Sequence, residues 1–304
     1  MTHERTRANA GRPTAARALA AILLLATVAC APNRLVLPSG PGAPTTEFQA
    51  PFDQASTACR AVRTMRATIR LAGRAGGQRM RGTLIAGLAR PNAVRLEGVA
   101  PFGPPAFILA AHDESATLLF PRDNRVLTGV SAADILDALA PGVRLAPAAL
   151  GAILSGCVVP DPQPAAGRVF DKGGPARIGD ATKGDARQRW LAVEVGRGAT
   201  AYLLQQQGQW RIVAGVLPEL EVWYDQFEGG LPRGVQIRSR AAQAPAIPLD
   251  LTLALSDLST NVTLNASVFE VDVPRDAAPL TLAELRESGP LGVKEKGRGS
   301  TDAR

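Results

Sequence analysis

The residues best suited to acid–base chemistry cluster around His112, the only histidine in the chain besides His3. A Ser–His–Asp hydrolase needs a serine and an acid that reach the imidazole from separate parts of the fold. Asp113 and Ser115 adjoin His112 in sequence, which predicts solvated turn residues instead. A zinc site needs three or four converging ligands, and one histidine without a free cysteine pair does not supply them. The chain also has no phosphate-binding or dinucleotide-binding glycine motif, so we expect no enzyme activity, catalytic residue, metal or cofactor.

Cys59 and Cys157 are the next candidates for chemistry, and two interpretations of them are open. In an exported protein the oxidising surroundings favour a disulfide between the two thiols. Unpaired, both would be small apolar side chains of the kind often found in a core. The sequence is compatible with both alternatives.

The third cysteine, Cys30, ends an apolar run over residues 18–29 that follows four arginines. A positive segment, a short apolar run and small residues before a cleavage point are the parts of a secretory signal peptide. Thr27-Val28-Ala29-Cys30 resembles the lipobox of bacterial lipoproteins, in which the cysteine thiol takes a diacylglycerol. We expect a signal peptide over residues 1–29 and lipidation of Cys30. Cleavage at another small residue and an uncleaved anchor are the alternatives.

The composition is that of a globular protein, with 46% hydrophobic and 20% charged residues. Only 4% of the residues are aromatic, while 30 Gly and 24 Pro favour turns and short strands over long helices. Residues 1–29 carry four Arg and one Glu, so their removal lowers the formal net charge from +7 to +4. The arginines are spread through the predicted strands rather than collected in one patch. We therefore expect no nucleic-acid partner, which needs a concentrated basic face.

Most of the chain shows the two-residue alternation of antiparallel strands with one buried face. In residues 248–258, for example, Leu249, Leu251, Leu253 and Leu255 all point the same way. The predicted strands cover residues 65–73, 78–89, 92–99, 106–115, 116–124, 125–129, 187–196, 200–207, 209–217, 220–228, 233–241, 248–258 and 267–273.

Four helices are predicted by apolar residues at helical spacing, two of them in the middle of the chain. Ser131 caps the first of these two, and Gly156 follows the second. The predicted helices cover residues 52–66, 131–142, 146–156 and 280–288.

The domain organisation follows from these elements. Residues 30–50, with the lipidated Cys30, are rich in Pro, Gly and Thr and form a flexible tether. One domain spans residues 51–290 and contains a long polar loop over 160–186. Residues 291–304 form a disordered, charged tail.

The interior of the predicted sheet has two interpretations. A sheet of about 11 strands that curls without closing encloses more volume than small side chains fill, and such barrels commonly hold an apolar ligand. The helices of residues 131–155 would then lie across the opening as a lid. The same leucines could equally form a filled core.

The stretch of residues 89–109, together with residues 116–121, 131–139 and 145–156, resembles the LolB family of outer-membrane lipoproteins. The likeness to the periplasmic LolA carriers is looser. In this family, an Arg-containing strand runs into a Gly-Pro segment. A strand pair, a helix and a leucine-rich helix that ends in Gly follow it. The residues in these places are Arg95, Pro101, Phe102, Gly103, Ile135, Leu136, Leu150 and Gly156.

This resemblance implies a mainly β (α+β) fold, an unclosed antiparallel β-barrel of about 11–12 strands with a helical lid. It also implies that the protein binds acyl chains of lipoproteins in an apolar cavity and helps to insert them into the outer membrane. A monomer and a periplasmic carrier as partner are expected. The side chains expected to line the cavity or the lid are Phe107, Leu109, Leu118, Phe120, Ile135, Leu136, Leu139, Leu150, Ile153 and Leu154.

In this family an exposed apolar residue on the loop between the third and fourth strands is needed for insertion, and Phe102 occupies that loop. Pro101, Phe102 and Gly103 are therefore the expected membrane-insertion loop. The alternative is a hairpin residue packed on its own sheet.

Ala31 and Pro32 follow Cys30, and no Asp is present there to retain the protein at the inner membrane. We therefore expect a lipid anchor at the periplasmic face of the outer membrane. The cargo could be another lipid than a lipoprotein's acyl chains. A different class of function is a structural or assembly lipoprotein that has the same fold and transports nothing.

Overall fold

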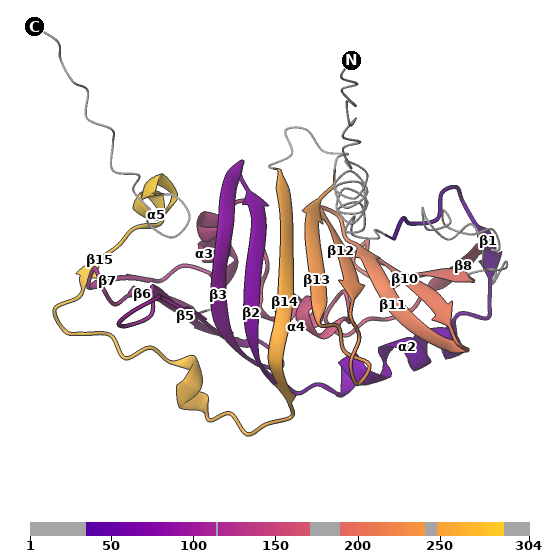
Figure 1. Ribbon diagram of the computed structural model, residues 1–304, viewed down its shortest axis with the longest axis horizontal. Helices are drawn as coiled ribbons and strands as arrows, with labels where there is room; N and C mark the ends of the chain where they lie inside the picture. The colour runs from indigo at the N-terminus through magenta and orange to yellow at the C-terminus, as the bar shows by residue number, and fades with distance from the viewer. Residues whose placement is uncertain (1–34, 114, 171–188, 241–247, 289–304) are drawn as a thin grey trace, which may run out of the picture. The chain divides into compact units, whose positions relative to one another are not determined.

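The computed structural model describes residues 35–113, 115–170, 189–240 and 248–288 (Figure 1). The chain divides into two compact units, one of Met1–Leu37 and Gly174–Asp185, and the other of Pro38–Gly173 and Ala186–Arg304. Every described helix and strand belongs to the second unit. The predicted signal peptide, Cys30 and the charged tail lie outside the described residues, as does most of the predicted loop 160–186.

The described strands form one sheet in the order β1-β8-β9-β10-β11-β12-β13-β14-β2-β3-β4-β5-β6-β7-β15. All pairs are antiparallel except β15 with β7. The strands are β1 (Ala43–Thr45), β2 (Thr64–Ala75), β3 (Gln78–Ala89), β4 (Ala93–Gly98), β5 (Phe107–His112), β6 (Ser115–Phe120), β7 (Arg125–Thr128), β8 (Ala166–Phe170), β9 (Trp190–Glu194), β10 (Thr200–Gln206), β11 (Gln209–Val216), β12 (Leu220–Asp225), β13 (Gly234–Ser239), β14 (Leu249–Thr260) and β15 (Ala278–Pro279).

The sheet does not close, because β1 pairs only with β8 and β15 only with β7. The predicted fold class, a mainly β protein with an unclosed antiparallel sheet and a few helices, is confirmed. The sheet has 15 strands where 11–12 were expected. The extra strands, β1, β8 and β15, are short segments at or next to the two edges of the sheet, which the alternation in the sequence does not reveal.

The long strands β2, β3 and β14 lie at the centre of the sheet and join its two halves (Figure 1). β14 pairs with β2 from Leu249↔Ala75 to Thr260↔Met65. The four leucines of β14 singled out in the sequence are all buried, with at most 6% exposure. Alternation was informative here because each strand buries one face and leaves the other in solvent.

The described helices are α2 (Gln49–Ala61), α3 (Ala132–Leu139), α4 (Pro147–Ser155), the short 3₁₀ helix η1 (Ala266–Phe269) and α5 (Leu282–Ser288). The Ser131 side chain accepts a hydrogen bond from the Asp134 amide at 3.1 Å, as expected of a cap. Gly156 ends α4 in the left-handed conformation, with φ 89°, where glycine carries no steric cost.

Three predicted segments differ in the structure. Ala43–Thr45 of the expected tether form β1 against β8, and β8 itself lies in the expected loop 160–186. The first helix spans Gln49–Ala61 rather than 52–66, because the chain enters β2 at Thr64.

The predicted strand over residues 267–273 is wrong. Its first residues form η1, and the segment that follows pairs with no strand. The carbonyls of Val268 and Glu270 accept hydrogen bonds from the Arg95 guanidinium at 3.1 and 2.8 Å. A side chain thus satisfies backbone groups that a neighbouring strand would otherwise satisfy.

Candidate functional site

The ten side chains expected to line a cavity or lid come together on β5, β6, α3 and α4. Nine of them are at most 8% exposed, and Phe120 is partly buried against them. They form one hydrophobic cluster with the inner face of the sheet, and none of them lines any of the three surface pockets that the structure describes. Of the two interpretations of the interior, the structure shows packed side chains at these positions.

Helix α3 and its flanks, residues 131–144, are here called the α3 segment. Its polar contacts are all internal: Arg144 pairs with Asp134 at 2.9 Å, and the Gly142 amide donates to the Asp137 carboxylate at 3.0 Å. Within the described residues, no hydrogen bond or ion pair joins the α3 segment to the sheet or to another helix. Buried apolar side chains alone hold it there, Ile135 with 0% exposure at their centre.

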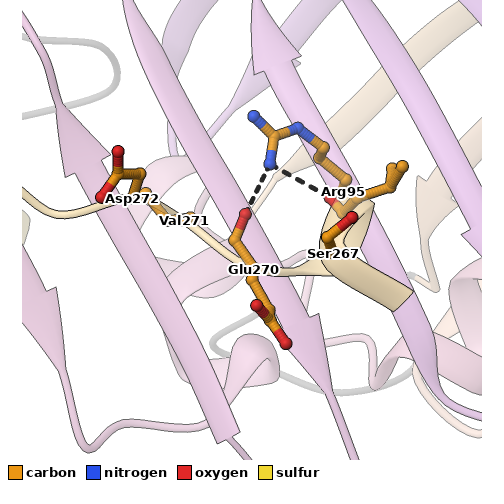
Figure 2. Close-up of a pocket in the computed structure, with 6 residues that line it drawn as sticks. Arg95, Ser267, Glu270, Val271 and Asp272 are labelled. Carbon is orange, nitrogen blue, oxygen red and sulfur yellow. Dashed lines mark hydrogen bonds between the residues drawn. The ribbon is translucent and has the colours of Figure 1, made fainter. Parts of the chain in front are cut away.

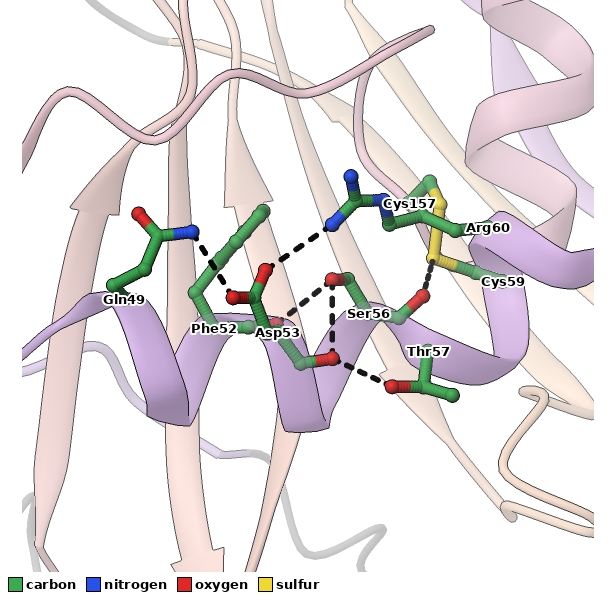
Figure 3. A network of polar contacts seen from close by, with 8 residues as sticks. All are labelled: Gln49, Phe52, Asp53, Ser56, Thr57, Cys59, Arg60 and Cys157. Carbon is green, nitrogen blue, oxygen red and sulfur yellow. Dashed lines mark hydrogen bonds and ion pairs between the residues drawn. A yellow bond between two sulfur atoms is a disulfide. The ribbon is translucent and has the colours of Figure 1, made fainter.

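Helix α4 and its flanks, residues 146–159, are here called the α4 segment, and they are fixed much more firmly. Cys157 forms a disulfide with Cys59 of α2, with an S–S distance of 2.07 Å (Figure 3). The Arg90 guanidinium donates to the Cys59 carbonyl at 3.0 Å and contacts the Cys157 sulfur at 3.9 Å. Burial lowers the pKa of Arg90, although nearby Asp161 opposes that shift. Of the two alternatives for the cysteines, the structure has the disulfide.

The partner helix α2 is itself well anchored. Asp53 accepts a hydrogen bond from Gln49 at 3.1 Å and pairs with Arg60 at 3.2 Å, while the buried Ser56 hydroxyl donates to the Phe52 carbonyl at 2.8 Å (Figure 3). Phe52 is fully buried, so α2 is part of the core. The disulfide therefore ties the α4 segment to a fixed element.

The expected insertion loop, Pro101 to Gly103, lies between β4 and β5. The Phe102 side chain is 87% exposed rather than packed on the sheet, and Val99 on the same connection is 47% exposed. From the turn between β6 and β7, Arg122 donates through Nη2 to the Phe102 carbonyl and through Nε to the Pro104 carbonyl at 3.4 Å. Arg122 thus holds the loop backbone while the ring extends into solvent. Sequence reasoning missed Arg122, because nothing local links it to residue 102.

A surface pocket of about 680 Å³ lies where η1 and the following residues cross β4 (Figure 2). Its lining consists of Arg95, Ser267, Val268, Glu270, Val271 and Asp272. Arg95 is bound on two sides, since its Nε also pairs with Glu97 at 2.6 Å. This arginine, which matched the family resemblance, therefore fastens the C-terminal segment to the sheet.

A second pocket, of about 460 Å³, has a more apolar lining that includes Val169, Leu191 and Trp210. The Arg189 guanidinium carbon lies 6.0 Å from the centre of the Trp210 ring, within the range of a cation–π contact. This pocket is formed by β8, β9, β11 and the start of α2, far in the sheet order from β5 and β6, which carry the predicted cavity residues.

His112 lies at the end of β5, and its Nδ1 is 3.1 Å from the Asp113 carboxylate, with both side chains more than 60% exposed. The Ser115 hydroxyl donates to the His112 backbone carbonyl at 3.0 Å, and not to the imidazole ring. In the described part of the chain, no three His, Cys, Asp or Glu residues are grouped to hold a metal ion, and no helix there is long and apolar enough to cross a bilayer.

The distribution of arginines differs from that expected from the sequence. Because β2 and β3 form one hairpin, their polar positions share the outer face of the sheet, which gathers five exposed arginines. They are Arg66, Arg70, Arg74, Arg79 and Arg81. The Gly76-Gly77 turn between two alternating stretches is the sequence signal that could have predicted this clustering.

Comparison with known proteins gives similarity in structure only. No protein-family model matches the chain, and no curated protein matches it. A LolA superfamily protein from Nitrosomonas europaea has 11% identity and a TM-score of 0.45, over 76% of this chain and 99% of that one.

Two further solved structures are more distant. An outer membrane lipoprotein-sorting protein domain from Vibrio parahaemolyticus has 10% identity and a TM-score of 0.38, over 68% and 88% of the two chains. LprF from Mycobacterium bovis has 12% identity and a TM-score of 0.31, over 78% and 100%. At TM-scores below 0.5, the function has to be argued from the residues of this chain.

Proposed function

We propose that this protein is an outer-membrane lipoprotein that binds acyl chains between the inner face of its sheet and the α3 segment, and so receives or inserts lipids or lipoproteins. The observation that carries the proposal is the attachment of the α3 segment by apolar contacts alone. Hydrophobic contacts are non-directional. An acyl chain can therefore replace them without breaking a hydrogen bond.

The packed interior is compatible with this role. Ile135, Leu136 and Leu139 of α3 fill the space in the protein without ligand, and outward movement of the α3 segment opens that space along the inner face. The cost is the exposure of these side chains, and the bound acyl chain offsets it at about 0.8 kcal/mol per buried methylene group. The α4 segment stays in place through its disulfide and forms a fixed wall.

The membrane part of the proposal rests on Phe102 and Cys30. An aromatic side chain that is 87% exposed loses unfavourable contact with water when it enters a bilayer. Lipidation of Cys30 would keep the domain at the periplasmic face of the outer membrane, and a periplasmic carrier would deliver the cargo. Phe102→Glu should leave folding intact and abolish delivery to membranes, measured by transfer of a labelled lipoprotein. Retained delivery would contradict the role of this loop.

Acyl-chain binding is tested directly by native mass spectrometry of the protein purified from membranes, together with binding of a fluorescent fatty acid. We expect a co-purifying lipid or saturable probe binding. Hydrogen exchange should change mainly in residues 131–144 when the probe binds. Leu136→Trp, which enlarges a buried side chain of α3 itself, should weaken probe binding, while Ala72→Ser on the outer face should not. Absence of both lipid and probe binding would refute the proposal.

The alternative is a structural or assembly lipoprotein that uses the same fold without a ligand. The dense packing of the ten predicted lining side chains is the observation that favours it. An empty protein that co-purifies with a stable protein partner would support this alternative.

A further inference from the structure

The outer face of the β2–β3 hairpin concentrates positive charge. Arg74 lies directly opposite Arg79 in the register of the two strands. Arg70 pairs with Thr83 and Arg81 with Ala72, so Arg70 and Arg81 are diagonal neighbours. We call Arg66, Arg70, Arg74, Arg79 and Arg81 the arginine face; all five side chains belong to exposed residues.

This charge is not neutralised by the rest of the described protein. None of the five side chains takes part in an ion pair or side-chain hydrogen bond with another described residue. On the neighbouring strand β14, Asp250 lies opposite Arg74, but Gln236 donates to its carboxylate at 2.7 Å and Arg238 lies 3.6 Å from it. Like charges directly opposite each other destabilise a sheet. The Arg74–Arg79 pair therefore presents two guanidinium groups that are available to an anionic partner.

The arginine face reaches the same end of the strands as the exposed apolar loop. β4 ends where Gly98 pairs with Leu84, and the Val99 amide still donates to the Thr83 carbonyl at 2.8 Å. Residues 78–83 of β3 continue beyond that point toward the hairpin turn. The connection that carries Val99 and Phe102 thus begins beside the part of β3 that carries two of the arginines.

We propose that the arginine face binds the phosphate groups of an anionic phospholipid surface and so orients the domain with the Phe102 loop against the bilayer. Arginine forks bind phosphate oxygens through paired hydrogen bonds. Apolar side chains next to a basic face are the pattern of peripheral membrane contact. A single-stranded nucleic acid would need aromatic stacking residues, whereas the outward neighbours on these strands are Thr68, Ala72, Thr83 and Ile85.

The inference deepens the membrane part of the proposed function and does not depend on acyl-chain binding. If vesicle binding needs the arginines and no acyl chain is bound, the membrane role of the arginine face is supported and the proposal of acyl-chain binding is refuted. If an acyl chain is bound and vesicle binding does not change when the arginines are replaced, acyl-chain binding is supported and the membrane role of the arginine face is refuted.

The test uses the chain from residue 30 onward with Cys30→Ser, so that neither a lipid anchor nor the apolar run of residues 18–29 masks the contribution of the domain. Sedimentation with vesicles of phosphatidylcholine, with or without phosphatidylglycerol, measures binding. Arg74→Gln with Arg79→Gln should weaken binding to the anionic vesicles about 25-fold, at about fivefold for each cation near the surface. The exposed pair Arg197→Gln with Arg275→Gln removes the same charge elsewhere and should change binding less than about twofold.

Several results would overturn the proposal. One is an equal loss in both double variants, which would mean that only net charge matters. Another is unchanged binding of the Arg74→Gln, Arg79→Gln variant to the anionic vesicles. That result would overturn the proposal even if the arginine face bound an acidic protein instead. Circular dichroism of both variants establishes that the sheet is intact, which is expected because the four side chains are exposed.

Discussion

The two helical segments that cover the inner face of the sheet are similar in sequence and differ in attachment. Both are short, apolar and adjacent in the chain, and Ile135 and Ile153 at their centres are each 0% exposed. The α4 segment is joined to α2 by a disulfide, whereas the α3 segment is held by apolar contacts. Burial alone therefore does not tell which segment can move; directional and covalent contacts do.

A third contact fixes the α4 segment to the sheet. The Val158 side chain packs against Gly215 of β11 so closely that a Cβ at position 215 would clash with it. The α3 segment instead packs on β6 and on α5. Opening the fold at α3 thus disturbs β6 near the edge formed by β7 and β15, and also the contact of Pro141 with Gly76 in the β2–β3 turn.

The largest effect is expected from removing the disulfide. Cys59→Ser with Cys157→Ser should lower the free energy of unfolding by about 4 kcal/mol, because the bond closes a loop with a sequence separation of 98. Urea denaturation measures this loss. Hydrogen exchange of the α4 segment should then approach that of the α3 segment. Unchanged protection of α4 would mean that the disulfide is not what distinguishes the two.

The next largest effect comes from the matched pair Ile135→Ala and Ile153→Ala. Each should cost about 3 kcal/mol of unfolding free energy, because both side chains are fully buried. Local exchange should separate them: the Ile135 variant should open residues 131–144, while the Ile153 variant should lose protection only through global unfolding. Local opening around Ile153 would contradict the comparison.

A smaller effect is expected at the start of α3. Ser131→Ala removes the hydroxyl that accepts from the Asp134 amide and should cost about 1 kcal/mol. The loss should appear as faster exchange of the first turn of α3 and not in α4. Ser131→Asp, which keeps an accepting oxygen, should restore most of the protection.

The smallest effect concerns pH and helix α5, which packs on α3. Hydrogen bonds from the Thr281 amide and hydroxyl, and then from Arg125, lower the pKa of Glu284 to about 2 from an ordinary value of 4.5. The carboxylate thus stabilises the fold above pH 4.5, and this contribution is lost as the pH falls toward 2.

Exchange of residues 282–288, compared across that pH range after correction for the intrinsic rate, tests this dependence. It should disappear in Glu284→Gln. The α4 segment should show no comparable change, and a parallel change there would contradict a local effect of Glu284 on α5.

Local patterns predicted the long strands and α3 well. β2, β3 and β14 each bury one face, so alternation marks them, and Ser131 is a cap that sequence alone identifies. Contacts between distant residues were the limit. Arg95 donates hydrogen bonds to the Val268 and Glu270 carbonyls, in a segment that was predicted to pair as a strand. The arginine face forms only because the register of the β2–β3 hairpin brings its residues together.

The candidate site shows the same division. The sequence identified ten apolar side chains that come together in the interior, and a Phe102 loop that is exposed. Both were recognisable locally, from apolar residues at regular spacing and from an apolar residue between prolines. It could not show that the space between the helices and the sheet is filled, since packing depends on the distance between elements. Nor could it show Arg122, which is 20 residues away from the carbonyl that it binds.

The pairing of β14 with β2 also sets an order for folding. Residues 64–128 can form the run of neighbouring strands from β2 to β7 as soon as they are available, since each pairs with the next in the chain. The free edge of β2 stays without its partner until residue 260 has arrived. Non-local pairing of this kind is slow, and an open strand edge is prone to aggregation. A nascent chain therefore passes through a period in which the edge of its central strand β2 is unpaired, and this period ends only when β14, the last long strand, is in place.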